Sequence, residues 1–174
     1  MANKYFSNNY GYDVLPQPIT KRQHLFIDAR DYLTASNTDL SFVVNLQDIG
    51  MPDYEEVEEV ELKSIMFPKI AGEEYYILDI PEFTGRVHST DNGSHDKFAV
   101  VYYDSSQTSA GDVKPMKGQD FDKKVHVFNP IKKRLSRFTV TFRKYGGDII
   151  TNTDIGSGDN YKKISMMFEF KIKT

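Results

Sequence analysis

Alternation of apolar and polar residues late in the sequence constrains the fold more than any other feature. In residues 135–143 the apolar side chains Phe138, Val140 and Phe142 alternate with arginine and threonine, and residues 165–172 alternate in the same way. A period of two places successive side chains on opposite faces of a strand, whereas an amphipathic helix requires a period near 3.6. Both segments are therefore predicted to be strands with one buried face.

Six further segments have the composition of strands. They are rich in β-branched and aromatic residues and are bounded by proline, glycine or polar clusters. These segments are residues 25–29, 40–46, 59–67, 75–80, 98–103 and 124–128. Between them we expect long polar loops at 82–97 and 105–122 and a short link at 130–134. Pro52 and the acids that follow it resemble a helix start and predict a single helical turn.

Eight short strands and several long loops predict an all-β fold. An eight-stranded single jelly roll, which is an antiparallel β-sandwich, fits this pattern best, and a small closed barrel, which usually has tighter hairpins, comes second. The 174 residues suit one such domain, residues 24–174, preceded by an extended N-terminal arm, residues 1–23.

The arm is rich in Asn, Tyr and Pro and has no periodicity, so it cannot pack a core alone. Its aromatic side chains are costly to leave in water and are of the kind that anchors interfaces. We expect the arm to become ordered on a neighbouring molecule, and the alternative is plain disorder. The interface candidates in the arm are Tyr5, Phe6, Tyr10 and Tyr12.

Composition excludes several classes of protein. The sequence has no cysteine, which excludes disulfides, thiolate metal sites and cysteine nucleophiles and fits a reducing compartment. No apolar run approaches the length of a membrane span, so direct membrane insertion is not expected. The first residues lack the apolar core of a secretory signal, so we expect synthesis and folding in the cytosol.

The net charge of -3 hides a strong asymmetry along the chain. Residues 48–96 hold 13 acidic and 3 basic residues, whereas residues 114–144 hold 2 acidic and 10 basic residues. A chain with one acidic and one basic flank can associate head to side with copies of itself or with complementary partners. The candidate interface residues are Glu55, Glu56 and Glu58 on the acidic side and Lys132, Lys133 and Arg134 on the basic side.

No pattern in the sequence indicates an enzyme or a cofactor site. The four histidines (His24, His88, His95 and His126) have no spacing that would converge on a metal. A nucleophile elbow, a P-loop and a dinucleotide fingerprint are all missing from the sequence. We therefore expect no catalytic, cofactor-binding or metal-binding residues.

Three other kinds of site remain as alternatives. Residues 148–160 contain four hard oxygen ligands for calcium, and residues 91–96 form a weaker candidate, although neither has EF-hand spacing. A basic segment beside two phenylalanines could contact nucleic acid, which the acidic pI near 5.8 makes a minority interpretation. A carbohydrate or receptor module would need exposed aromatic residues. The calcium candidates are Asn152, Asp154, Asp159 and Asn160. The nucleic-acid candidates are Lys132, Lys133, Arg134 and Arg137 beside Phe128 and Phe138. The aromatic candidates are Tyr102, Tyr103 and Tyr145.

The first predicted strand ends in a polar cluster formed by Asp28, Arg30 and Asp31. Two carboxylates around one guanidinium can pair across a strand end and bind nearby backbone N–H groups. We interpret the cluster as a structural clasp that joins the arm to the core, so Arg30→Ala should lower thermal stability or assembly without abolishing any catalysis.

The order of these features resembles the single jelly-roll penton and minor capsid proteins of large icosahedral double-stranded DNA viruses and their virophage relatives. In that family a hydrophobic-Asp-Ser-Arg-Asp segment precedes a Val-Glu-Leu strand that ends at Ile-Pro, and the closing strands flank a Gly turn. Ala29 replaces the usual Ser, and residues 82–134 show no motif that aligns. The matching segments are Phe26-Ile-Asp-Ala-Arg-Asp31, residues 40–46, 57–68, 75–81, 135–147 and 164–172.

The resemblance implies a non-enzymatic structural protein of the virion, made in the host cytoplasm and located in the capsid. As a penton it would form a homopentamer at the five-fold vertex. As another minor capsid protein it would bind the major capsid protein through its arm and loops. Its partners would be copies of itself, the major capsid protein and other minor capsid proteins.

Overall fold

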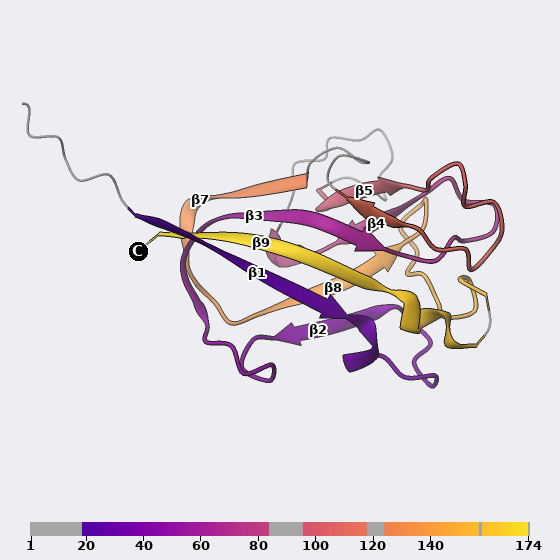
Figure 1. The fold of residues 1–174 in the computed structure, drawn as a ribbon, viewed down its shortest axis with the longest axis horizontal. Coiled ribbons are helices and arrows are strands. Elements are labelled where there is room, and N and C mark those ends of the chain that lie inside the picture. Colours follow the sequence, from indigo (N-terminus) through magenta and orange to yellow (C-terminus); the bar gives the residue numbers. More distant parts are fainter. Residues whose placement is uncertain (1–18, 84–95, 118–123, 157, 174) are drawn as a thin grey trace, which may run out of the picture.

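Two antiparallel β-sheets pack face to face in the computed structural model, which describes residues 19–83, 96–117, 124–156 and 158–173 (Figure 1). The first sheet contains β1 (Thr20–Asp28), β9 (Ser165–Lys173), β3 (Tyr54–Met66), β6 (Pro115–Lys117) and β7 (Lys124–Leu135). The second sheet contains β2 (Ser41–Asn45), β8 (Arg137–Arg143), β4 (Tyr75–Asp79) and β5 (Ala99–Tyr102). Three short 3₁₀ turns complete the described elements: η1 (Ala29–Asp31), η2 (Pro81–Phe83) and η3 (Asp159–Lys163).

The strand pairing is nested. The first strand pairs with the last, β2 pairs with β8, β3 pairs with β6 and β7, and β4 and β5 form the central hairpin. A long hairpin ribbon that is rolled into two sheets gives this order, and the rolling brings β9 beside β3 and β8 beside β4. The chain is therefore an all-β antiparallel sandwich with jelly-roll connectivity, as the pattern of short strands and long loops predicted, and in the described residues β6 adds a ninth strand to the eight expected.

The core lies between the two sheets and is rich in aromatic rings. The side chains of β8 and β9 that point into the core include Phe138, Phe142 and Phe168, which the alternation of apolar and polar residues predicted to be buried. Phe83 is fully buried and its ring lies within 6.2 Å of five other phenylalanine rings. The five neighbours of Phe83 are Phe98, Phe128, Phe138, Phe168 and Phe170.

Four local predictions are wrong, and each has a physical reason. The helical turn after Pro52 is the start of β3, which has a bulge near Glu56, where φ is 51°. The predicted link at 130–134 is the second half of β7, because an edge strand tolerates Pro130. Within the predicted loop 105–122, residues 115–117 form β6 beside the end of β3. Thr20 already belongs to β1, so the strand includes four residues that were assigned to the arm.

Candidate interaction surfaces

The predicted clasp is centred on Asp28, the last residue of β1. The Asp28 carboxylate accepts hydrogen bonds from the Arg30 backbone N–H (3.0 Å) and from Arg30 Nε (2.9 Å), so it caps η1 and holds the guanidinium. These hydrogen bonds from Arg30 lower the pKa of Asp28 below its ordinary value. Asp31 is exposed and makes no hydrogen bond or ion pair with any described residue. Ala29 is buried, and its N–H donates to the Ile164 carbonyl (3.0 Å).

A row of charged side chains crosses the outer face of the first sheet. Glu169 lies between His24 on β1 and Glu61 on β3, and both glutamates are buried. The Glu169 carboxylate accepts from Arg22 Nη1 at 2.6 Å, and its other oxygen lies 2.9 Å from His24 Nε2. Burial works to raise the pKa of Glu169, but the charges of Lys63, Arg22 and His24 outweigh it, so this pKa lies below its ordinary value.

The acidic and basic segments pair with each other inside one chain. Glu55 on β3 lies opposite Arg134 on β7, and Arg134 Nε donates to the Asp53 carboxylate at 2.5 Å. Glu58 pairs instead with Lys171 on β9, which lies outside the basic segment, at 3.0 Å. The start of the acidic segment and the second half of β7 are therefore neighbours in one sheet, and the Asp53–Arg134 ion pair neutralises part of the charge of each. Glu55, Glu56, Lys132, Lys133 and Arg134 remain exposed.

The pairing also weakens the nucleic-acid interpretation. Arg134 already has a carboxylate partner, and Phe128 and Phe138 are buried in the core, so neither ring is available to stack on a base. Lys132, Lys133 and Arg137 are exposed, but they have no exposed aromatic partner among the described ring contacts.

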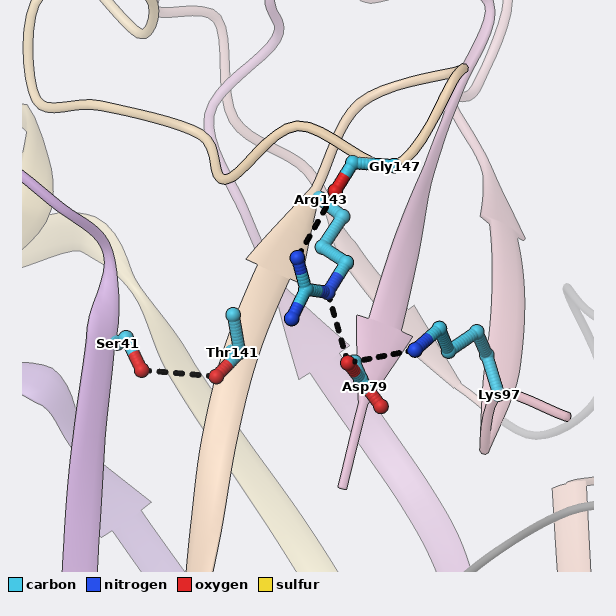
Figure 2. A network of polar contacts seen from close by, with 6 residues as sticks. All are labelled: Ser41, Asp79, Lys97, Thr141, Arg143 and Gly147. Atoms are coloured by element: carbon cyan, nitrogen blue, oxygen red, sulfur yellow. Dashed lines mark hydrogen bonds and ion pairs between the residues drawn. The ribbon is translucent and has the colours of Figure 1, made fainter. Parts of the chain in front are cut away.

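A polar network lies on the outer face of the second sheet (Figure 2). One oxygen of Asp79 on β4 accepts from Arg143 Nε on β8 (2.7 Å) and from Lys97 Nζ, just before β5 (3.0 Å). Arg143 Nη1 also donates to the Gly147 carbonyl (2.8 Å), so the network fixes the turn after β8. Asp79 is only 4% exposed although it points away from the core. We interpret the network as a structural tie between strands and turn.

Three tyrosines form a contiguous patch at one end of this face, which we call the tyrosine surface: Tyr75 of β4, Tyr102 of β5 and Tyr145 of the turn after β8. The ring centroids of Tyr75 and Tyr102 are 5.6 Å apart, and those of Tyr75 and Tyr145 are 6.2 Å apart. Tyr102 is 63% exposed and Tyr145 is 61% exposed.

Tyr103, by contrast, belongs to the interior side of the sheet. Its hydroxyl accepts from the Ile70 N–H and donates to the Pro68 carbonyl, each at 3.3 Å, and the Lys69 ammonium lies over its ring. Two of the three aromatic candidates are thus brought together, and Tyr75 takes the place expected for Tyr103. Register explains the exchange, since Tyr75 lies directly opposite Tyr102 on the outer face.

Three of the four calcium candidates of residues 148–160 already have other partners, whereas the buried side-chain oxygen of Asn152 has no hydrogen-bond partner among the described residues. Asp154 accepts from Lys144 Nζ (2.6 Å) and from the Thr151 N–H and hydroxyl, and Asp159 pairs with Lys162. The Asn160 amide donates to two backbone carbonyls of the same loop. The described residues contain no group of three or more His, Cys, Asp or Glu side chains arranged to hold a metal ion.

Several predicted residues lie outside the described ranges. Among them are the arm residues Tyr5, Phe6, Tyr10 and Tyr12, the histidines His88 and His95, and most of residues 91–96. No described helix is long and apolar enough to cross a membrane.

Sequence reasoning missed Glu82, which follows Pro81 in a segment read as a polar loop. Its carboxylate accepts from the Thr139 N–H (2.9 Å) and hydroxyl (3.2 Å), where β4 no longer pairs with β8. A side chain thus replaces a strand partner, and no local pattern signals such a contact. A comparison of the sequence with protein-family models found no match, and neither did a comparison with curated proteins.

Proposed function

We propose that the chain is a structural subunit of an icosahedral virus capsid, either the penton at the five-fold vertex or another minor capsid protein. It would assemble with copies of itself and with the major capsid protein. The jelly-roll strand order supports this proposal more than any other observation, because the segments that resemble the capsid family fall on the first four and the last two strands of that order. They lie on β1 and η1, β2, β3, β4, β8 and β9.

The outer surfaces of the sandwich are also suited to association. Exposed apolar side chains lie on both sheets, including Phe26 (59% exposed) and Val127 (62% exposed) on the first sheet and Val43 on the second. A subunit whose two faces both contact neighbours would bury such side chains. We therefore expect the sheet faces, rather than the loops, to meet neighbouring subunits.

The test is the mass of the full chain in solution, alone and mixed with the major capsid protein of the same virus. A penton forms a closed ring of five in native mass spectrometry and in negative-stain images. A minor capsid protein that is not the penton binds the major capsid protein without forming that ring. A strict monomer at high concentration that binds no capsid subunit would overturn the proposal.

A matched pair of variants locates the contact. Val127→Arg places a charge on the outer face of the first sheet and should reduce ring formation or capsid binding while the Tm stays unchanged. Val113→Arg makes the same change at an exposed loop residue and should leave association intact. Equal losses in both variants would show that the sheet face has no special role.

A further inference from the structure

The tyrosine surface offers a continuous aromatic face. Its rings come from three different elements, and the Tyr75 ring lies between the other two, 5.6 Å from Tyr102 and 6.2 Å from Tyr145 by ring centroids. Exposed tyrosines in such clusters are typical anchors of protein interfaces, because they bury much area at a low entropic cost.

The surface is also held rigidly. Arg143 fixes the turn that presents Tyr145, through its hydrogen bonds to Asp79 and to the Gly147 carbonyl (Figure 2). Two backbone hydrogen bonds close the same turn, from the Lys144 N–H to the Asp148 carbonyl (2.8 Å) and from the Gly147 N–H to the Lys144 carbonyl (3.0 Å). A preorganised surface loses little entropy on binding, which favours affinity.

The chain itself contains a segment suited to this surface. Leu15-Pro16-Gln17-Pro18 directly precedes the first described residues and holds two prolines separated by one residue. Proline favours the extended polyproline II conformation, and proline rings pack against aromatic side chains in many recognition surfaces. A segment of this composition loses less conformational entropy on binding than a flexible peptide does.

The distances within one chain exclude the Leu15–Pro18 segment of the same copy. β1 begins at Thr20 beside the end of β9, which lies next to Val57 at the start of β3. The tyrosine surface lies beyond the other end of β3, where the ring of Tyr76 stacks on Phe67 at 4.4 Å. Ten residues of strand separate Val57 from Phe67, which is about 30 Å. Leu15 is five residues from Thr20, at most about 18 Å of extended chain, so it cannot reach the surface of its own copy.

We propose that the tyrosine surface binds the Leu15–Pro18 segment of a neighbouring copy of this chain. The proposal rests on the proposed function for the presence of neighbouring copies, and it names the contact through which the arm links them. A carbohydrate ligand is the competing use of the same tyrosines.

The absence of cysteine from the sequence allows a clean test with disulfide trapping. Full chains carrying Gln17→Cys and Val100→Cys, with tags of different mass, are mixed and mildly oxidised. Val100 lies on the same face as Tyr102, one row away, opposite Ile77. Because each variant has a single thiol, a disulfide between the two tags forms only when the arm of one copy reaches the tyrosine surface of another. We expect this mixed disulfide as the main product.

Two further variants and one control decide the outcome. The first variant adds Tyr102→Ala and Tyr145→Ala to the Val100→Cys chain, and the second adds Pro16→Ser and Pro18→Ser to the Gln17→Cys chain. Each should lower the yield of mixed disulfide at least about ten-fold, the loss typical of an aromatic anchor. Val127→Cys, which is 62% exposed on the other sheet and so more accessible than the half-buried Val100, should give no mixed disulfide above background. Equal yields of mixed disulfide at Val100→Cys and Val127→Cys would overturn the proposal. So would a yield at Val100→Cys that is unchanged by Tyr102→Ala with Tyr145→Ala.

The remaining outcomes separate the two proposals. Rings of five with no trapped arm contradict the arm contact alone. Trapped arms in a protein that joins no capsid contradict the capsid role alone. Binding to a glycan array that is lost in Tyr102→Ala and unaffected by Pro16→Ser with Pro18→Ser would assign the surface to carbohydrate and overturn the arm contact.

Discussion

Tyr76 and Tyr103 are neighbouring tyrosines of the core with opposite hydrogen-bonding situations. The Tyr76 ring is fully buried, and its hydroxyl finds no hydrogen-bond partner among the described residues. Burial, with a smaller effect of Tyr103, raises the pKa of Tyr76 well above its ordinary value. The Tyr103 hydroxyl, 5.3 Å away by ring centroids, both accepts and donates. A buried hydroxyl without a partner costs free energy, whereas a satisfied one stabilises.

Replacing each tyrosine by phenylalanine should therefore have opposite effects. Tyr76→Phe removes an unsatisfied hydroxyl and should leave the free energy of unfolding unchanged or raise it by up to about 1 kcal/mol. Tyr103→Phe leaves the Ile70 N–H without its acceptor and should lower the free energy of unfolding by about 1 kcal/mol. Urea titration of both variants measures the difference. A larger loss in Tyr76→Phe than in Tyr103→Phe would show that the assignment of the two hydroxyls is wrong.

At the scale of elements, η1 depends on Asp28 more than on Arg30. The carboxylate accepts from the backbone of the turn, whereas the guanidinium is mostly exposed. Asp28→Ala should lower stability by about 1 kcal/mol, as the loss of an N-cap does. Arg30→Ala should lower the Tm by a smaller amount, and Asp31→Ala should not change it. Thermal unfolding measures all three, and an Arg30→Ala loss as large as that of Asp28→Ala would contradict the capping role.

The row of charges across β1, β9 and β3 predicts a dependence of stability on pH. The folded-state pKa of Glu169 lies below its ordinary value, so the carboxylate stabilises the fold above the unfolded-state pKa of about 4.3. This contribution is lost as the pH falls through the folded-state pKa. The groups that face Glu169 are Arg22 and His24 on β1 and Glu61 and Lys63 on β3.

Glu169→Gln should cost about 1–2 kcal/mol at neutral pH and should make the loss of stability on acidification smaller than in the wild type. Glu59→Gln, one row away on the same face, is the matched control, because Glu59 forms no ion pair with a described residue. Unfolding free energies at pH 7 and in acid measure both. Parallel pH profiles for Glu169→Gln and the wild type would exclude this role.

Sequence periodicity predicted the elements whose own residues determine them. In β8 and β9 the apolar side chains are buried as the alternation requires, so the strands were predictable, although the outward-facing Thr141 and Glu169 are buried as well. The second half of β7 was not, because its pairing with β3 outweighs the local signal of Pro130. Phe83 stands alone in a polar segment, and its burial among five rings follows from the packing of distant strands. Tertiary contacts, which no local pattern contains, determine such positions.

For the molecule as a whole, the antiparallel pairing of β3 and β7 changes the meaning of the charge asymmetry. Segments of opposite charge lie far apart in the sequence, but the roll places Glu55 opposite Arg134 in one sheet. The sequence identified these residues correctly as exposed and charged, yet it could not show that they face each other within the same chain. Of the residues suggested for an aromatic site, it found Tyr102 and Tyr145 but not Tyr75, since cross-strand register is a property of the pair.

This arrangement predicts how self-association responds to salt. Since part of the opposite charge is neutralised within each copy, association through apolar faces and the arm should change less than about three-fold between about 50 and about 500 mM NaCl. Sedimentation equilibrium measures the association constant. Lys132→Glu with Lys133→Glu, both exposed on β7, should leave it nearly unchanged. A fall of more than about ten-fold in high salt would favour charge-driven, head-to-side contacts instead.

The pairing of Thr20 with Lys173 has a mechanical consequence. β1 and β9 are antiparallel neighbours whose outer residues lie at the same end of the sandwich (Figure 1). A force that pulls these two positions apart acts on one pair of hydrogen bonds at a time and peels β1 from the edge of the sheet. The same strands pulled from opposite ends would resist together. Tension applied between Thr20 and Lys173 therefore unfolds the chain from β1, the edge strand, one residue pair at a time.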